Sequence, residues 1–311
     1  MRKILWIMPN KEKKFSGIFK YNKELIKIKT KSCNVKTLYT GNSELYFHTF
    51  MFKFFLIPFY LILNSHRFYT LVLPEEGYAF LRFFSFAKKN IIIIHDYRKV
   101  FSKNNVINLN ERIKQFYLDI NFIFIKKFFK IIVPSKFTKE LISKNLFINQ
   151  KKILIIPNII NFENKKSKYN SKFRVLKNLR KNSQIVLTIT SNETRKNIKQ
   201  LNEIVKKCKK INFIIVGNLS DEFNLNNVFN FKNISDENLI YLFKKSNTYL
   251  DVSLFEGFGR SLIEAQIFKL NVICFKTKIN KEILKNSATF IRHNTKFQNI
   301  CKILKKNNLN R

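Results

Sequence analysis

The chain has 311 residues and a formal net charge of +39, from 59 Lys and Arg residues against 20 Asp and Glu residues. Its length is typical of about two domains and allows a large buried core. A hydrophobic fraction of 45% with 15% aromatic residues excludes a mainly disordered chain, and a content of only 6 Gly and 5 Pro excludes collagen-like and linker-rich arrays.

The excess of positive charge has two explanations. One is a surface that binds polyanions, either nucleic acid or an anionic membrane. The other is a compositional bias toward Lys, Asn, Ile and Phe, the residues of AT-rich codons; Phe alone occurs 34 times. The basic residues are spread along the whole chain, which favours the bias as the main cause. Both explanations imply a positive electrostatic potential at the protein surface.

Short runs of apolar, β-branched residues recur along the chain, with helical or loop segments between them. The first set predicts strands at residues 4–8, 35–39, 69–73, 91–95, 131–133 and 153–156. The second set predicts strands at residues 185–189, 213–216, 228–231, 249–252 and 272–275. Many of these runs are continuously apolar, as expected for parallel strands that are covered on both faces.

The longest apolar run, residues 50–63, is interrupted by Lys53 and Pro58. It is too short for a membrane span of ~20 residues. Two interpretations remain: a buried helix of a domain, which we favour, and a helix at a membrane interface with basic residues nearby. We expect no signal peptide, because Pro9 and charged residues follow the short apolar run after Met1. We therefore expect a cytoplasmic protein, peripheral on the inner face of the cell membrane under the second interpretation.

The cysteines are Cys33, Cys208, Cys274 and Cys301, far apart and without a C-x-x-C pair. This spacing predicts reduced cytosolic thiols and neither a disulfide framework nor a zinc site. The histidines are equally scattered.

The polar, basic stretch of residues 161–182 separates the two sets of strands and is predicted to be the linker. We expect two doubly wound α/β domains, residues 1–165 and 166–311. An interdomain cleft at the carboxyl ends of the strands is then the expected ligand site.

A strand, a tight turn and a helix are predicted in succession within residues 249–265. The turn contains Gly257, Phe258 and Gly259. The helix N-terminus that follows suits a phosphate. Glu256 and Glu264, with seven residues between them, can each accept hydrogen bonds from two adjacent sugar hydroxyls. The alternative is a helix cap with a solvated glutamate.

Residues 254–265 resemble the E-x7-E signature of the family 4 glycosyltransferases, in the glycosyl transferases group 1. Other features of that family occur in its order, at residues 131–141, 155–158, 188–197 with an R-K-N turn, and 213–217. The resemblance implies a GT-B fold, which has two Rossmann-like domains and an interdomain active site. It also implies retaining transfer of a sugar, of hexosyltransferase type, from a nucleotide-sugar donor.

The resemblance also implies roles for individual residues. Glu264 would bind the ribose hydroxyls, Glu256 would contact the donor sugar, and Lys196 would neutralise the diphosphate. The implied catalytic residues are His95, Lys196 and Glu256. The implied donor-binding residues are Gly17, Arg195, Lys196, Glu256, Gly257, Phe258, Gly259 and Glu264. We expect the side chains of Lys196 and Glu264 to stand in an open cleft.

No D-x-D motif occurs, so a fixed cation and a helix N-terminus would stabilise the leaving diphosphate. We therefore expect no metal and no cofactor. The expected partners are a nucleotide-sugar donor, a glycan or lipid-linked acceptor and an anionic membrane surface, with no specific nucleic acid. The expected pathway is surface polysaccharide or lipopolysaccharide biosynthesis.

Two alternatives stay open. Family members usually continue through a helix that crosses back to the first domain, whereas residues 294–311 can supply one short basic helix at most. This departure would fit a catalytically weak GT-B relic that serves as a sugar-binding or partner subunit. The second alternative is a polyanion-binding protein that uses the +39 charge, although no helix-turn-helix, RNP or zinc-finger signature supports it.

Overall fold

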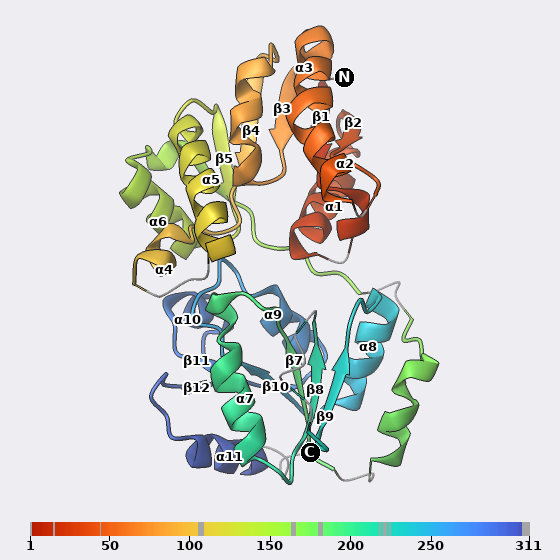
Figure 1. The fold of residues 1–311 in the computed structure, drawn as a ribbon. Helices are drawn as coiled ribbons and strands as arrows, with labels where there is room; N and C mark the ends of the chain where they lie inside the picture. The colour runs from red at the N-terminus through yellow and green to blue at the C-terminus, as the bar shows by residue number, and fades with distance from the viewer. Residues whose placement is uncertain are drawn as a thin grey trace. The chain divides into compact units, whose positions relative to one another are not determined.

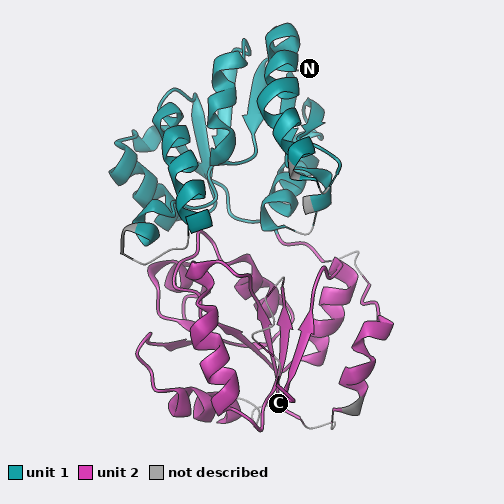
Figure 2. Cartoon of the chain, in the orientation of Figure 1, with its two compact units in different colours: residues 1–159 teal, residues 160–311 magenta. Residues whose placement is uncertain are grey.

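The computed structural model describes residues 2–14, 16–43, 45–104, 109–162, 166–179, 183–217, 219, 223 and 225–306. The chain forms two compact units, Met1–Ile159 and Ile160–Arg311, which Figure 2 shows in teal and magenta. The predicted division lay slightly later, between residues 165 and 166, and residue 165 is outside the described residues.

The first unit is built on a six-stranded parallel sheet in the order β2-β1-β3-β4-β5-β6 (Figure 1). Its strands are β1 (Lys3–Met8), β2 (Asn34–Tyr39), β3 (Thr70–Leu73), β4 (Lys89–Ile93), β5 (Lys130–Val133) and β6 (Ile153–Ile155). Its α-helices are α1 (Gly17–Lys29), α2 (Tyr46–Met51), α3 (Ile57–Asn64), α4 (Lys99–Asn104), α5 (Leu109–Ile125) and α6 (Lys136–Leu146). Shorter or tighter helices are η1 (Lys11–Lys13), the π-helix η2 (Phe52–Leu56), η3 (Ser65–Arg67), η4 (Glu76–Phe84) and η5 (Gln150–Lys152).

The second unit also has a six-stranded parallel sheet, in the order β12-β11-β10-β7-β8-β9. Its strands are β7 (Ile185–Ile189), β8 (Asn212–Val216), β9 (Val228–Phe231), β10 (Thr248–Asp251), β11 (Asn271–Phe275) and β12 (Thr289–Ile291). Its helices are η6 (Ser171–Asn178), η7 (Thr194–Lys196), α7 (Ile198–Lys207), α8 (Asp236–Lys245), α9 (Arg260–Ile267), α10 (Lys278–Leu284) and α11 (Phe297–Lys306).

Alternate residues of a strand enter different cores, as a sheet covered on both faces requires. In β1, Leu5 and Ile7 belong to one hydrophobic cluster, whereas Ile4, Trp6 and Met8 belong to another. In β7, Ile185 and Leu187 likewise separate from Val186. The predicted fold class is confirmed: two Rossmann-like, doubly wound α/β domains. Each predicted strand exists, but β12 was not predicted, because its three residues at the sheet edge are mostly exposed or half-buried.

The predicted linker is partly wrong. Within it, η6 buries Phe173 and Leu176 completely in a core of the second unit. The segment was predicted to be a linker because Lys, Asn and Ser residues dominate its composition and only these two apolar residues anchor it. A single turn or two of helix with two buried apolar side chains is enough to fix such a segment to the domain.

The apolar run at residues 50–63 lies in a longer helical stretch, Phe47–Arg67, which is long and apolar enough to cross a membrane by length and composition. The predicted run was shorter because it counted only the most apolar part. Ile57 and Leu61 are fully buried in the core of the first unit, so one side of α3 packs on the sheet. Only 17% of the apolar window is buried inside the unit.

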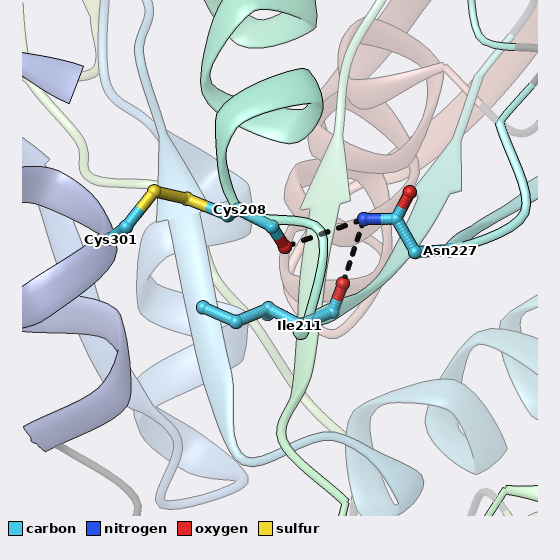
Figure 3. Close-up of a disulfide and its surroundings, with 4 residues drawn as sticks. All are labelled: Cys208, Ile211, Asn227 and Cys301. Carbon is cyan, nitrogen blue, oxygen red and sulfur yellow. Dashed lines mark hydrogen bonds between the residues drawn. A yellow bond between two sulfur atoms is a disulfide. The ribbon is translucent and has the colours of Figure 1, made fainter. Parts of the chain in front are cut away.

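The prediction that all cysteines are reduced is wrong for one pair. Cys208, at the end of α7, forms a disulfide with Cys301 of α11, and their Cα atoms are 5.5 Å apart (Figure 3). The sequence hid the pair because 93 residues separate the two positions and only the fold brings α7 and α11 together. Asn227 Nδ2 supports the same corner by donating to the carbonyl oxygens of Ile211 and Cys208. Cys33 and Cys274 are free thiols.

We expect the disulfide to stabilise the second unit substantially. Closing a loop of 93 residues removes entropy from the unfolded chain equivalent to roughly 4–5 kcal/mol in the chain-entropy model. Cys301→Ser should therefore lower the midpoint of urea denaturation markedly, whereas Cys33→Ser should not. Equal midpoints for both variants and the wild type, with and without reductant, would contradict this expectation.

Candidate functional site

The site begins where the order of strands reverses in the second sheet. Counted from β7, the strand order is 3-2-1-4-5-6, and β7 and β10 are the adjacent strands at the reversal. In open α/β sheets, ligands bind outside the carboxyl ends of the strands at this point. The two predicted motifs, the R-K-N turn and the E-G-F-G turn, directly follow β7 and β10. Topology therefore brings together segments that are about 60 residues apart in the sequence.

The two turns are fastened to each other by backbone and side-chain contacts. Leu254 N donates to the carbonyl oxygen of Arg195 at 2.7 Å, and Arg195 Nη1 donates to that of Phe255 at 3.3 Å. Asn197 ends the R-K-N turn in the left-handed conformation, with a φ of 55°, and α7 starts directly after it. Asn tolerates this conformation better than most residues, which explains why it suits the turn.

A partly shielded ion cluster lies between the turns. Lys196 Nζ is 2.6 Å and Arg195 Nη1 is 3.0 Å from the same oxygen, Oε1 of Glu256. Arg195 Nε also contacts Glu193 Oε2 at 2.5 Å. Burial alone would raise the pKa of Glu256, but the charges of Lys196 and Arg195 outweigh it and lower this pKa to about 2. Glu256 is therefore ionised at every physiological pH.

Asp251, which no motif singled out, lies beneath this cluster at the end of β10. Its Oδ1 accepts hydrogen bonds from the backbone N and the hydroxyl of Ser253, which shape the start of the E-G-F-G turn. Burial raises the pKa of Asp251, although the Lys196 charge opposes the shift. Among the described residues, Asp251 Oδ2 has no hydrogen-bond partner. An acidic residue closing an otherwise apolar strand was the available sequence signal.

The glycines at the strand ends are required by close contacts. Gly259 has a φ of 78° and precedes α9, and a Cβ at this position would lie 2.8 Å from Leu262 Cδ1. A Cβ at Gly217, after β8, would lie 1.9 Å from the carbonyl oxygen of Thr190, after β7. Gly257 is buried and Phe258 half-buried. No side chain caps the N-terminus of α9 within the described residues, so its positive dipole end is not neutralised by an acidic side chain there.

Glu264 lies one turn into α9 and its side chain is only 6% exposed. Arg260 Nε donates to its Oε1 at 2.8 Å, an i,i+4 pair along the helix. The expectation that Lys196 and Glu264 stand in the open is therefore wrong. Both side chains are largely buried and engaged in ion pairs, because each charge removed from water needs a partner.

The predicted residues of the first unit lie at the corresponding edge of the other sheet. Gly17 opens α1 behind its N-cap Ser16, and nothing lies within 4 Å of where its Cβ would be. His95 follows β4, which ends at Ile93. Its Nε2 lies 2.9 Å from the carbonyl oxygen of Pro74. A carbonyl only accepts, so Nε2 carries the proton. Burial lowers the pKa of His95, which keeps the imidazole neutral at pH 7.

An acidic cluster beside His95 was missed by the sequence analysis. Glu76 is buried, and burial together with the negative charges of Asp96 and Glu75 raises its pKa to about 8. Asp96 is held by two contacts from Arg98 Nε, at 3.0 and 2.9 Å. Two glutamates directly after the buried strand β3 were the signal that could have revealed this cluster. Within the described residues, no group of three or more His, Cys, Asp or Glu side chains is arranged to hold a metal ion.

We expect Glu256 to contribute to stability in a pH-dependent way. Its folded pKa of about 2 lies below its usual value of 4.5, so the contribution is complete above pH 4.5 and is lost as the pH falls toward 2. Glu256→Gln should lower the unfolding free energy at pH 7 by roughly 1–3 kcal/mol. The difference from the wild type should shrink on acidification.

Urea titrations across this pH range test the expectation. Glu203→Gln is the matched control, because Glu203 forms an exposed ion pair with Lys206 that should contribute at most about 1 kcal/mol. A Glu256→Gln difference that stays constant with pH, or equals that of the control, would show that the cluster does not act as described.

Comparisons with known proteins agree with the architecture. Sucrose-phosphate synthase from Thermosynechococcus elongatus superimposes with a TM-score of 0.72 and 13% identity, covering 98% of this chain and 89% of its own. HepE from Anabaena, in complex with UDP and glucose, gives a TM-score of 0.69 and 13% identity over 98% and 89% of the two chains. The lipopolysaccharide outer core galactosyltransferase WaaB gives 0.61 and 13% over 98% and 90%. At this identity, the likeness establishes the fold.

A search of curated protein sequences found no match. Residues 170–306 match the family model described as glycosyl transferases group 1. This range contains both turns of the site, the ion cluster at Glu256 and the helix that carries Glu264. The chain thus has the GT-B fold, and its second unit matches the family model of the glycosyl transferases group 1.

Proposed function

We propose that the protein is a retaining glycosyltransferase that moves a sugar, of hexose type, from a nucleotide-sugar donor to a glycan or lipid-linked acceptor. The observation that carries the proposal is the cluster of Arg195, Lys196 and Glu256 at the strand reversal of a group 1 domain. Cleavage of the sugar–phosphate bond leaves its electron pair on the diphosphate. A positively charged group held beside the diphosphate stabilises this negative charge as it develops and lowers the activation barrier.

The residues can take complementary roles. An ammonium group has three donors, so Lys196 can hold Glu256 and contact a phosphate oxygen at the same time. Arg195 and the N-terminus of α9 after Gly259 add positive potential. Glu256, ionised and held in place by two cations, is suited to accept hydrogen bonds from donor-sugar hydroxyls. Glu264 would accept those of the ribose, with Arg260 orienting its carboxylate.

The first unit would bind the acceptor. Neutral His95, with its proton on Nε2 facing Pro74, presents Nδ1 as an acceptor, and Gly17 leaves room for a ligand at the start of α1. The acceptor class is proposed to belong to surface polysaccharide or lipopolysaccharide biosynthesis. Support for this acceptor class comes from the fold shared with WaaB, whose name gives a lipopolysaccharide galactosyltransferase. The fold shared with HepE, which was solved with UDP and glucose, supports the nucleotide-sugar donor.

We place the protein in the cytoplasm, at the inner face of the cell membrane. Nucleotide-sugar donors and lipid-linked acceptors meet at that surface. The helical stretch Phe47–Arg67, largely exposed and apolar, supports a peripheral attachment. The weakly active relic and the general polyanion binder remain outcomes that the following experiments would reveal.

Lys196→Met should reduce kcat for donor turnover by about 10²–10³-fold with a smaller rise in donor KM, because the charge matters most as the leaving group becomes negative. Glu264→Gln should mainly raise donor KM, since ribose hydroxyls do not react. Steady-state release of the nucleoside diphosphate measures both effects. Lys199→Met is the matched control, an exposed lysine three residues further along. Full activity in both site variants would contradict the roles assigned to Lys196 and Glu264, whereas absence of donor turnover by the wild type would favour the relic or polyanion hypothesis.

Activity should survive EDTA. We propose that Lys196, Arg195 and the α9 N-terminus stabilise the diphosphate, so that no divalent cation is needed. The measurement is donor turnover after exhaustive chelation, with Mg²⁺ or Mn²⁺ added back. Complete loss that is restored by either cation would mean that a metal neutralises the diphosphate instead.

A further inference from the structure

The first unit exposes large apolar side chains on one layer of helices. Figure 1 shows α3, η4 and α5 side by side on one face of the first sheet. Aromatic contacts join these elements: Phe54 of η2, the segment directly before α3, stacks on Phe80 of η4, and Phe83 of η4 packs against Phe124 of α5. We call the outward surface of this layer the apolar face. It includes exposed side chains of α2 and η2, which precede α3, and of the loop after η4, and its residues, each more than 40% exposed, are Phe47, Phe50, Phe55, Leu56, Phe59, Ile62, Leu63, Phe83, Phe86, Ile113, Phe116, Ile120 and Ile123.

Helix α5 shows how unusual this surface is. Its exposed apolar residues follow helical spacing, at Ile113, Phe116, Ile120 and Ile123. Its opposite side already supplies Leu118, Phe122 and Ile125 to the core of the unit. A helix on the surface of a soluble domain would carry polar residues on the outer stripe. Monomers rarely expose apolar patches beyond a few hundred Å², and larger ones mark interaction sites.

A basic hollow borders the apolar face. It has a volume of about 520 Å³ and lies at the amino ends of β4, β5 and β6, the sheet edge opposite to His95. Its cationic lining residues are Arg82, Lys88, Lys127, Lys130, Lys151 and Lys152. Among the described residues that line it, none is acidic. This hollow could not be predicted from the sequence, because its cations come from four separate segments.

Shared residues join the hollow to the apolar face. Arg82 and Phe83 are neighbours in η4, and Lys127 Nζ lies 5.2 Å from the centroid of the Phe83 ring. Phe129, half-exposed in the hollow, has Lys89 Nζ 4.3 Å above its ring. The two features therefore form one surface, with apolar rings beside a pocket of positive charge.

We propose that this surface docks the first unit on an anionic lipid bilayer, with the apolar face in the interface and the hollow on lipid phosphates. Apolar burial and attraction to anionic headgroups are the two contributions that such binding needs. The stretch Phe47–Arg67 lies in the plane of the bilayer rather than across it, because Ile57 and Leu61 are held in the core of the unit. A second copy of this chain, with its net charge of +39, would be repelled by the basic hollow.

The inference rests on the proposed function for its purpose, since a lipid-linked acceptor would be presented at that surface. It can nevertheless be tested independently. The experiment is cosedimentation of the full chain with vesicles of phosphatidylcholine alone or mixed with phosphatidylglycerol, at increasing salt. We expect binding to the mixed vesicles only, and release at high salt as the charges become screened.

Two sets of variants locate the surface. Phe116→Ser with Ile123→Ser removes apolar contacts, and its matched control is Ile28→Ser with Val175→Ser, exposed apolar residues elsewhere. A triple variant reverses charges in the hollow, with Lys88→Glu, Lys127→Glu and Lys151→Glu. Its matched control makes the same charge change on the second unit, with Lys209→Glu, Lys244→Glu and Lys305→Glu. Each lysine near an anionic bilayer contributes about fivefold in binding, so reversing three should weaken binding about a hundredfold or more.

The controls should bind like the wild type, and all variants should still hydrolyse the donor in solution. Absence of donor turnover together with intact vesicle binding would instead contradict the proposed function and leave the docking surface supported. Three results would overturn the docking surface: equal binding to neutral vesicles, retention at high salt as for a membrane span, or equal loss in variants and controls. Concentration-dependent dimers that Phe116→Ser with Ile123→Ser abolishes, without vesicle binding, would show a second copy on this face.

Discussion

The ion pair between Lys196 and Glu256 ties the turn after β7 to the turn after β10. Because Arg195 contacts the same carboxylate oxygen, one acidic group positions two cations at the strand reversal. The pair is largely shielded from water. Removing one partner would therefore leave the other charge without its counter-ion in a place where water compensates it poorly. The geometry of the surrounding backbone, including the Leu254 to Arg195 hydrogen bond, depends on the two turns staying together.

In both units, the residues that follow the parallel strands gather at one edge of the sheet, but the two edges carry different chemical groups. Parallel strands collect the residues that follow them at one edge, and the covering helices keep the sheet dry on both faces. In the second unit, this edge carries cations and the N-terminus of α9, a combination suited to phosphate. In the first unit, it carries neutral His95 and a buried acidic cluster in which burial and neighbouring negative charges raise the pKa of Glu76 to about 8. The opposite edge of the first sheet is basic and is continuous with the apolar face.

Local patterns in the sequence predict most of the fold. Continuous β-branched runs define strands such as β7, and the Gly259 turn followed by a helix is recognisable without any contact information. Three features escaped because they depend on distant segments: the disulfide from Cys208 to Cys301, the pairing of Lys196 with Glu256, and the basic hollow. The anchors of η6, Phe173 and Leu176, escaped because a polar composition surrounds them. Sequence identifies residue types at strand ends, whereas their ionisation and exposure follow from packing.

Hydrogen–deuterium exchange with and without a nucleotide-sugar tests most directly whether the donor binds at the strand reversal. The account predicts slower exchange in the turn at residues 194–197 and in the turn and helix at residues 254–264, and no change around Lys151 in the basic hollow. Glu264→Gln should remove most of this protection at the same donor concentration, because it weakens donor binding. Protection that appears only outside the two turns, or that is unaffected by Glu264→Gln, would contradict the assignment of the site.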